Sequence, residues 1–275
     1  MKLNTPLSTK EKQMISLEIL DFFHDYCEKN NLTYYLAYGT LLGAVRHHGF
    51  IPWDDDIDVL IPRCDYEYLL ESFRDPSGKF EIVSSTTKNW YLLPFAKLQN
   101  TKTKRIKENG QIDDRHFGIG IDLCPLDGMP DDLEGASKVF QRKNKEFLKV
   151  LWRLDTYRRI SNASSIILKL KHLLGSTLFS IGLLSKEAQR LSKSPYSVDY
   201  DKAKKVACVV GIFSRKFCPF DKKLLEKTEL QFEGRSFFAP KGYHEILTLE
   251  YGDYMTPPDE SHRFSNHAEQ YVLID

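Results

Sequence analysis

The sequence predicts an α+β protein, with a mixed sheet flanked by helices and a mainly helical, basic insertion in the middle of the chain. Three observations support this fold class. An amphipathic helical pattern opens the chain, strand-like apolar runs then interleave with helical patterns to about residue 130, and a long helical stretch rich in Lys and Arg follows. With 275 residues, of which 41% are hydrophobic, the chain is long enough to bury a sizeable core.

Local patterns place the elements of the first half. Ser8 and Glu11 have the spacing of a capping box, so a helix is expected to begin there. Pro62 ends the strand before it, because proline has no amide hydrogen to donate to a sheet. The other expected elements are short helices at 41–48 and 64–73, and strands at 32–38, 57–61, 80–84, 91–98 and 119–123.

Composition divides the chain into three parts. Residues 8–130 form the expected core domain, 131–216 the helical basic insertion, and 217–275 a loop-rich C-terminal segment expected to pack back on the core. Between Lys138 and Lys216 there are 18 Lys and Arg but only 5 Asp and Glu, whereas the whole chain has 39 and 38. The middle is therefore basic and the remainder acidic, which suggests one surface for anions and another for a metal.

Targeting signals and cysteines favour a cytoplasmic protein. The N-terminal 12 residues are polar and lack the apolar region of a signal peptide. The five cysteines are scattered without a CxxC pair, as expected of reduced thiols. The most apolar stretch, 166–184, contains Lys169 and Lys171, and a lysine at the bilayer centre costs about 2.5–3.5 kcal/mol. We therefore expect no membrane span.

The same apolar and basic stretch leaves two interpretations of the middle segment. Residues 168–179 would form an interfacial amphipathic helix that draws the protein to the inner face of an anionic cell membrane. The alternative is a helical appendage of the core with a solvated basic face. No stacking-aromatic motif or recognition module accompanies the charge, so a nucleic-acid partner is not expected.

The run Asp54-Asp55-Asp56-Ile57-Asp58 carries the strongest chemical signal. Alternate residues of a strand share a face, so Asp54, Asp56 and Asp58 are expected to point the same way. Clustered carboxylates need a cation, and their hard oxygens suit Mg²⁺ or Mn²⁺. Asp122 lies in another apolar strand and would share that metal. The alternative is a solvated acidic turn after Pro52.

A second signal precedes the acidic run. Gly39-Thr40 follows an expected strand and precedes an expected helix, so its backbone N–H groups would form an anion site for phosphate. Arg46 lies one to two turns further on and would bind phosphate with its guanidinium fork.

These residues resemble the signature of the LicD family of phosphotransferases, which includes bacterial phosphorylcholine transferases and relatives of the fukutin-related proteins. The similar segments are 38–46 and 49–59, then 96–98, 121–128, 232–240 and 251–258. The resemblance covers roughly residues 10–130 and 230–270, whereas the basic middle matches only loosely.

The resemblance implies a nucleotidyltransferase-like core in which the Gly-Thr turn and the Asp-x-Asp pair hold metal and phosphates. Asp56 and Asp58 would ligate Mg²⁺ (or Mn²⁺), with Asp122 as a third ligand or as the base that activates the acceptor hydroxyl. Lys97 would contact the pyrophosphate, or else be a surface lysine. His267 falls near the family's C-terminal histidine, although the neighbouring His262 leaves the register open.

The resemblance also implies the reaction. The donor would be CDP-choline or a similar CDP-alcohol, and the acceptor a sugar hydroxyl of a lipid-linked glycan precursor of teichoic acid or lipopolysaccharide. Two alternatives stay open at this point: a nucleotidyltransferase that makes a CDP- or UDP-activated product, and a non-catalytic regulatory subunit with the same fold. Neither the alcohol nor the oligomeric state is specified by the sequence.

Overall fold

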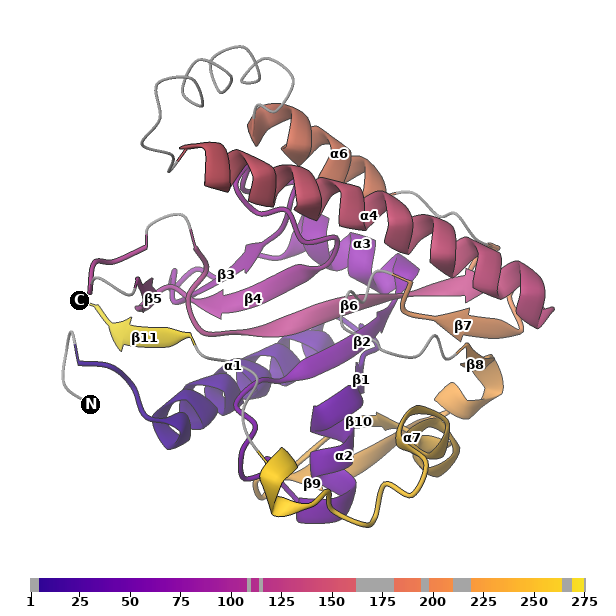
Figure 1. The fold of residues 1–275 in the computed structure, drawn as a ribbon. Coiled ribbons are helices and arrows are strands. Elements are labelled where there is room, and N and C mark those ends of the chain that lie inside the picture. Colours follow the sequence, from indigo (N-terminus) through magenta and orange to yellow (C-terminus); the bar gives the residue numbers. More distant parts are fainter. Residues whose placement is uncertain are drawn as a thin grey trace.

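The computed structural model describes residues 5–107, 110–113, 116–161, 181–193, 198–209, 219–263 and 269–274. It confirms the α+β class (Figure 1). The helices are α1 Thr9–Lys29, α2 Tyr38–His47, α3 Arg63–Ser72, α4 Leu133–Ser161, α6 Ile181–Lys193 and α7 Tyr243–Tyr251. The strands are β1 Tyr35–Leu36, β2 Asp58–Pro62, β3 Phe80–Val83, β4 Ala96–Asn100, β5 Thr103–Ile106, β6 Gly120–Met129, β7 Lys205–Ala207, β8 Phe220–Asp221, β9 Lys227–Phe232, β10 Arg235–Pro240 and β11 Gln270–Leu273.

The main sheet of the described residues has seven strands. Its order is β1-β2-β6-β4-β3, and β7 joins β6 and β8 joins β7 at the far end of β6. Strands β2 and β6 pair in parallel, whereas their other neighbours are antiparallel, so the sheet is mixed as predicted. Smaller pairs, β9–β10 and β5–β11, lie outside it.

Helices cover the sheet on different sides. In Figure 1, α4 and α6 lie side by side above the sheet, and α2, α7 and the β9–β10 hairpin lie below it. Helix α1 contacts β4 and β6 and contributes Ile19, Leu20 and Phe23 to the larger core cluster. A second cluster lies on the opposite face of β2 and β6, through Leu60, Cys124 and Leu126. Strands β2 and β6 are thus buried on both faces.

Several predicted elements agree with the structure and others differ in their bounds, among them the strand predicted at 32–38, which is only Tyr35–Leu36. Ser8 caps α1 through a complete capping box with Glu11, as predicted. The strand predicted at 91–98 begins only at Ala96, where pairing with Leu123 starts. Helix α2 begins at Tyr38 rather than at residue 41, because the Leu41 amide donates to the Ala37 carbonyl. Gly39 and Thr40 consequently lie inside the first helical turn.

The middle segment is helical at α4 and α6, but it also supplies a strand, since β7 pairs with the end of β6. None of the helices described has both the length and the hydropathy needed to cross a bilayer. The stretch 168–179, for which an interfacial helix was predicted, lies outside the described residues.

Candidate active site on strands β2, β4 and β6

Three charged side chains form a row across adjacent strands of the main sheet. Asp58 of β2 is in register with Asp122 of β6, and Lys97 of β4 is in register with the same Asp122. All three are half-buried, whereas Val59, Ile121 and Leu123 beside them are buried in the core. Strand pairing thus fixes Lys97, Asp122 and Asp58 side by side, and we call them the charged row.

Lys97 is the cation of the charged row. Its ammonium donates to Asp122 Oδ1, and it lies 4.8 Å from the centre of the Phe117 ring. Burial alone would lower its pKa, but Asp122 and the further charges of Asp58 and Asp56 outweigh burial and raise it. Lys97 is therefore held in its charged form.

The aspartates around the charged row carry more negative charge than Lys97 can neutralise. Burial raises the pKa of Asp58 well above its ordinary value, and the charges of Asp56 and Asp122 raise it further, while Lys97 opposes them. The pKa of Asp54 rises to about 8, first through burial and then through Asp56. Such mutual repulsion is the condition under which a cation or a proton is bound.

The strand predicted at 57–61 agrees with β2, but the acidic loop before it, residues 54–57, does not have the strand geometry that was expected to align Asp54 and Asp56 with Asp58. Residues 54–57 are irregular, and β2 begins only at Asp58. The Asp54 amide donates to the Ile51 carbonyl at 2.9 Å, and Gln13 of α1 donates to the Asp54 carbonyl at 2.7 Å. The backbone of Asp54 is thus hydrogen-bonded within a local turn and to α1, and not to a neighbouring strand. Asp54, Asp56 and Asp58 are nevertheless half-buried while Asp55 and Ile57 are buried, so the alternation in exposure is as expected.

Asp55 has a different role from its neighbours. It is buried and forms an ion pair with Lys12 of α1, a residue that no pattern in the sequence marked as functional. The pair ties the acidic loop to α1, so Asp55 anchors the loop rather than remaining available to a ligand.

The first turn of α2 adjoins the acidic loop. A Cβ at Gly39 would lie 2.8 Å from Asp54 Oδ2, so only glycine lets the carboxylate approach this closely. Thr40 Oγ1 accepts a hydrogen bond of 2.9 Å from the Asp58 amide. The predicted Gly-Thr turn is thereby joined to both ends of the acidic run.

Arg46 is held by the C-terminal segment. Its Nη1 donates to the Tyr254 carbonyl at 2.7 Å, and its Nε contacts His47 at 3.0 Å. Burial and the charge of Arg263 lower its pKa. Its phosphate-binding role stays a prediction. His267, also predicted to bind substrate, lies outside the described residues.

The donor set near the charged row has the chemistry of a magnesium site, namely hard carboxylate oxygens in mutual repulsion. Within the described ranges, however, no group of three or more His, Cys, Asp or Glu side chains is arranged to hold a metal ion. Asp122 is instead engaged by Lys97. The metal therefore stays a prediction.

Two tyrosines near the charged row carried no functional signal in the sequence. The Tyr91 hydroxyl is buried with no hydrogen-bond partner among the residues described, and the charge of Asp122 raises its pKa after burial does. The Tyr251 pKa is raised by burial and Glu250, and then by Asp58, Asp54 and Asp56. The segment 251–258 resembles the LicD family, but that resemblance assigns no role to Tyr251.

The chain is similar to known proteins over the region that contains this site. Residues 31–152 match the family model described as "LicD/FKTN/FKRP, nucleotidyltransferase domain". The chain is 30% identical over 279 residues to the lipopolysaccharide cholinephosphotransferase LicD of Haemophilus influenzae, an alignment that covers 97% of this chain and 99% of the relative.

Two uncharacterized rickettsial proteins also match. That of Rickettsia prowazekii is 46% identical over 124 residues, which is 42% of this chain and 46% of the relative. That of Rickettsia typhi is 43% identical over 68 residues, or 23% and 22% of the two chains. The residues matched by the family model, 31–152, include the whole charged row and the acidic loop.

Proposed function

The chain belongs to the LicD family, and from this premise we propose that it transfers phosphocholine from CDP-choline, or another phospho-alcohol from a similar donor, to a sugar hydroxyl of a cell-surface glycan precursor. The observation that carries the proposal is the charged row. It combines a half-buried lysine that is held charged with carboxylates too numerous for that lysine to neutralise. Such a site suits a pyrophosphate bound together with a cation.

Asp56 and Asp58 would hold Mg²⁺ or Mn²⁺, with Asp54 and Asp122 as the further carboxylates. Bound there, the metal would neutralise the pyrophosphate and the departing CMP. The raised pKa values of Asp54 and Asp58 support this assignment, because a divalent cation would offset the repulsion that burial intensifies.

The chain's own residues would position the reactants. Thr40 already accepts a hydrogen bond from the Asp58 amide, so its hydroxyl proton would be donated to a phosphate oxygen, beside the N–H groups at the start of α2. Lys97 would bind the pyrophosphate as a point charge, and Arg46 would add a second cation. Asp122 would accept the proton of the attacking sugar hydroxyl, or serve as a ligand only.

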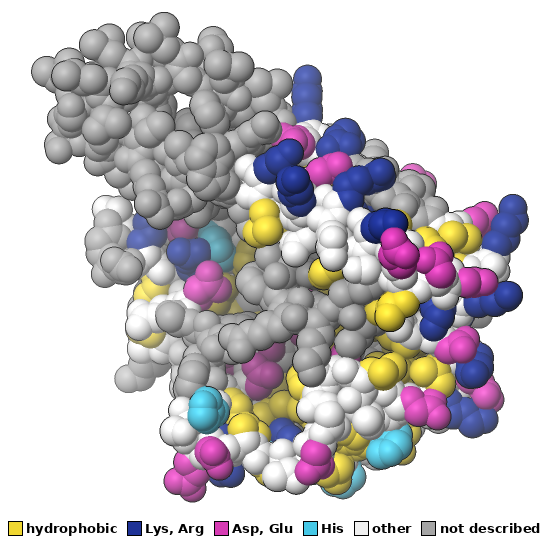
Figure 2. All heavy atoms as spheres, turned by 45° about the vertical axis from the view of Figure 1, so that its right-hand side comes forward, with side chains coloured by type: hydrophobic (Ala, Val, Ile, Leu, Met, Phe, Trp, Pro, Cys, Tyr) yellow, Lys and Arg dark blue, Asp and Glu magenta, His cyan; other side chains and the backbone are white. Residues whose placement is uncertain are grey.

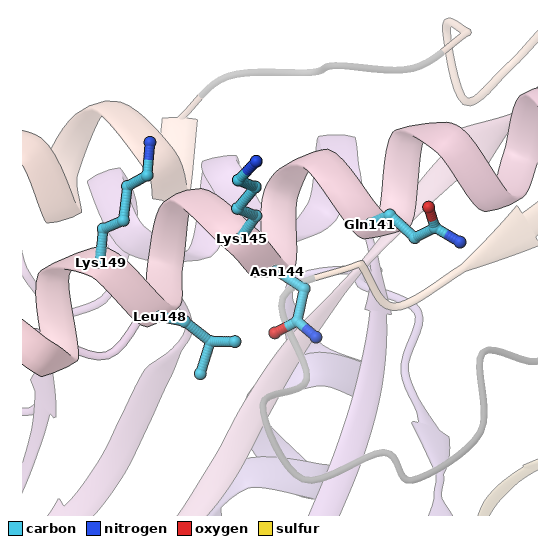
Figure 3. Close-up of a pocket in the computed structure, with 5 residues that line it drawn as sticks. All are labelled: Gln141, Asn144, Lys145, Leu148 and Lys149. Carbon is cyan, nitrogen blue, oxygen red and sulfur yellow. The ribbon is translucent and has the colours of Figure 1, made fainter.

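A basic stripe on α4 supports an anionic acceptor. Lys138, Arg142, Lys145 and Lys149 recur at spacings of four and three residues, and all are exposed. In Figure 2, Lys and Arg side chains gather on the upper part of the described surface. Lys145, Lys149, Leu148, Gln141 and Asn144 line a hollow of about 450 Å³ on α4; in Figure 3 the two lysine side chains extend upward from the helix and those of Leu148 and Asn144 downward. A helix that exposes a leucine and several lysines suits the headgroup region of an anionic membrane.

Lipopolysaccharide is the acceptor named for the Haemophilus relative, and we propose it or a teichoic acid precursor here. The reaction would then take place on the cytoplasmic side, with α4 against the inner face of the membrane that holds the lipid-linked glycan. No partner of nucleic-acid type is proposed.

The test is product release from a donor panel. Purified protein would be incubated with choline-free lipopolysaccharide, Mg²⁺ or Mn²⁺, and CDP-choline, CDP-ribitol or CDP-glycerol. CMP release together with labelled glycan supports transfer. Pyrophosphate release from CTP and phosphocholine would instead show that the protein makes the activated donor. No reaction in either assay would overturn the catalytic assignment.

A further inference from the structure

The C-terminal end of α7 holds a carboxylate oxygen that has no hydrogen-bond partner within the described part of the chain. Glu250 Oε2 is shielded from solvent and accepts no hydrogen bond from the residues described. Burial, followed by Cys208, raises the pKa of its carboxyl to about 7. A buried acceptor without a donor costs folding free energy, so its presence points to a partner that arrives from outside.

Two phenols lie near this carboxylate. The Tyr251 pKa is raised by burial and next by Glu250, and the Tyr38 pKa by burial, the two thiols Cys208 and Cys124, and Glu250. Tyr38 belongs to α2, which packs against α7 (Figure 1). Its backbone φ is 47°, a left-handed conformation that a bulky aromatic residue seldom adopts. The fold therefore holds Tyr38 in place at some cost.

The Tyr251 phenol is influenced by the charges of Glu250 and also of the charged row and acidic loop. Besides Glu250, the charges that act on its phenol are those of Asp58, Asp54 and Asp56. Tyr251 is also 44% exposed, so an incoming ligand can reach it. Tyr251, the residue next to Glu250 in the chain, is thus influenced by that carboxylate and also by the acidic residues of the proposed pyrophosphate site.

We propose that Glu250, flanked by Tyr38 and Tyr251, binds the trimethylammonium group of the transferred alcohol. The inference rests on the proposed function, and it assigns the residues that select the alcohol. A quaternary ammonium has no N–H to donate, so it is recognised by negative charge and aromatic rings. A neutral alditol would leave the Glu250 carboxylate buried and unpaired, which disfavours such donors.

The test compares a charged donor with a neutral one of the same shape. CMP release onto choline-free lipopolysaccharide is measured with CDP-choline and with CDP-3,3-dimethylbutanol, in which carbon replaces the quaternary nitrogen. We expect the wild-type kcat/KM to be roughly 10- to 30-fold higher for CDP-choline. Glu250→Gln should remove that preference, mainly through a higher KM for CDP-choline. Glu245→Gln, an exposed position of the same helix, is the control and should leave it intact.

A second variant separates recognition from folding. Glu250→Met removes an acceptor that lacks a partner, so its thermal midpoint should equal or exceed that of the wild type while the preference is lost. An equal loss on both donors in Glu250→Gln, or no preference in the wild type, would overturn the inference. CMP release from CDP-ribitol but not from CDP-choline would overturn it and leave phospho-alcohol transfer standing. Release from no CDP-alcohol would overturn both.

Discussion

Strands β2 and β6 carry buried or half-buried charges at both of their ends, and the two ends are balanced differently. At the first end, Lys97 is the cation that faces Asp122, Asp58 and the acidic loop, and the pKa of Asp58 is raised. At the other end, Asp127 of β6 meets Arg63, which follows β2. Arg63 donates two hydrogen bonds to Asp127, of 2.7 and 2.8 Å.

The charges of Arg63 and Asp127 are matched and hydrogen-bonded. Asp127 is 1% exposed and the Arg63 side chain 11%, and Arg63 donates a third hydrogen bond to the Ser192 carbonyl of α6. Burial lowers the pKa of Arg63, but its hydrogen bonds with Asp127 outweigh burial and raise it. The comparison indicates that matched charges join α3, α6 and the sheet, whereas unmatched charges mark the place where a ligand is expected.

The largest expected effect is on catalysis at the unmatched end. Asp58→Asn and Asp122→Asn should each lower kcat/KM for CMP release by about 10³-fold or more, since each removes charge from the site of the pyrophosphate and metal. Glu71→Gln, an exposed carboxylate of α3, should leave the rate unchanged. Full activity in Asp58→Asn would refute the assignment of the charged row.

The next effect is on stability at the matched end. Asp127→Asn should lower the free energy of unfolding by about 3–5 kcal/mol, because it leaves the Arg63 guanidinium buried without its partner. Chemical denaturation measures this loss, and kcat of the folded fraction should change little. If the variant does not fold, the double variant Arg63→Met/Asp127→Leu should recover most of the stability. A larger loss of activity than of stability would instead place the pair in the catalytic site.

A smaller effect of opposite sign is expected at the unmatched end. Asp54 has a pKa of about 8 in the folded protein against an ordinary 3.8, so its contribution to stability is lost as pH rises through about 8. In EDTA, Asp58→Asn relieves the same repulsion and should raise the thermal midpoint at pH 8.5 by about 2–5 °C, with less gain at pH 6. Added Mg²⁺ should stabilise the wild type more than the variant. A lower midpoint for Asp58→Asn at pH 8.5 would show that the charges are already balanced.

Local patterns in the sequence were enough to predict part of this arrangement. The capping box at Ser8 and the apolar runs around Asp58 and Asp122 depend on neighbours in sequence, and both predictions agree with the structure. The strand predicted at 57–61 agrees with β2, but the strand geometry expected for Asp54 and Asp56 was wrong, because residues 54–57 are irregular and a side chain of α1 holds that backbone. In the acidic loop, half-buried and buried residues alternate along the sequence as they would in a strand, so the sequence pattern could not distinguish the two.

The remaining features depend on contacts between distant segments. Lys97 and Asp122 meet only through the pairing of β4 with β6, and Lys12 meets Asp55 across 43 positions. Helix α7, which carries Glu250 and Tyr251, packs against α2 although about 200 positions separate the two helices. Periodicity within one window carries no information on such pairings, so Lys12, Tyr251 and Glu250 were not predicted as parts of the site. Asp122 was predicted from its place in an apolar strand, and Lys97 from the family resemblance, but neither prediction paired the two.

The smallest expected effect tests how tightly the unmatched end is built. Gly39→Ala would place a Cβ 2.8 Å from Asp54 Oδ2, and the flexible carboxylate would shift by a few tenths of an ångström. We expect a roughly 3- to 10-fold loss of kcat/KM with little change in thermal midpoint. In an Asp54→Ala background the same substitution should have almost no effect, because the carboxylate that a Cβ would approach is gone. Additive losses in this double-mutant cycle would show that Gly39 acts on the phosphate directly, and the contact with Asp54 would then be incidental.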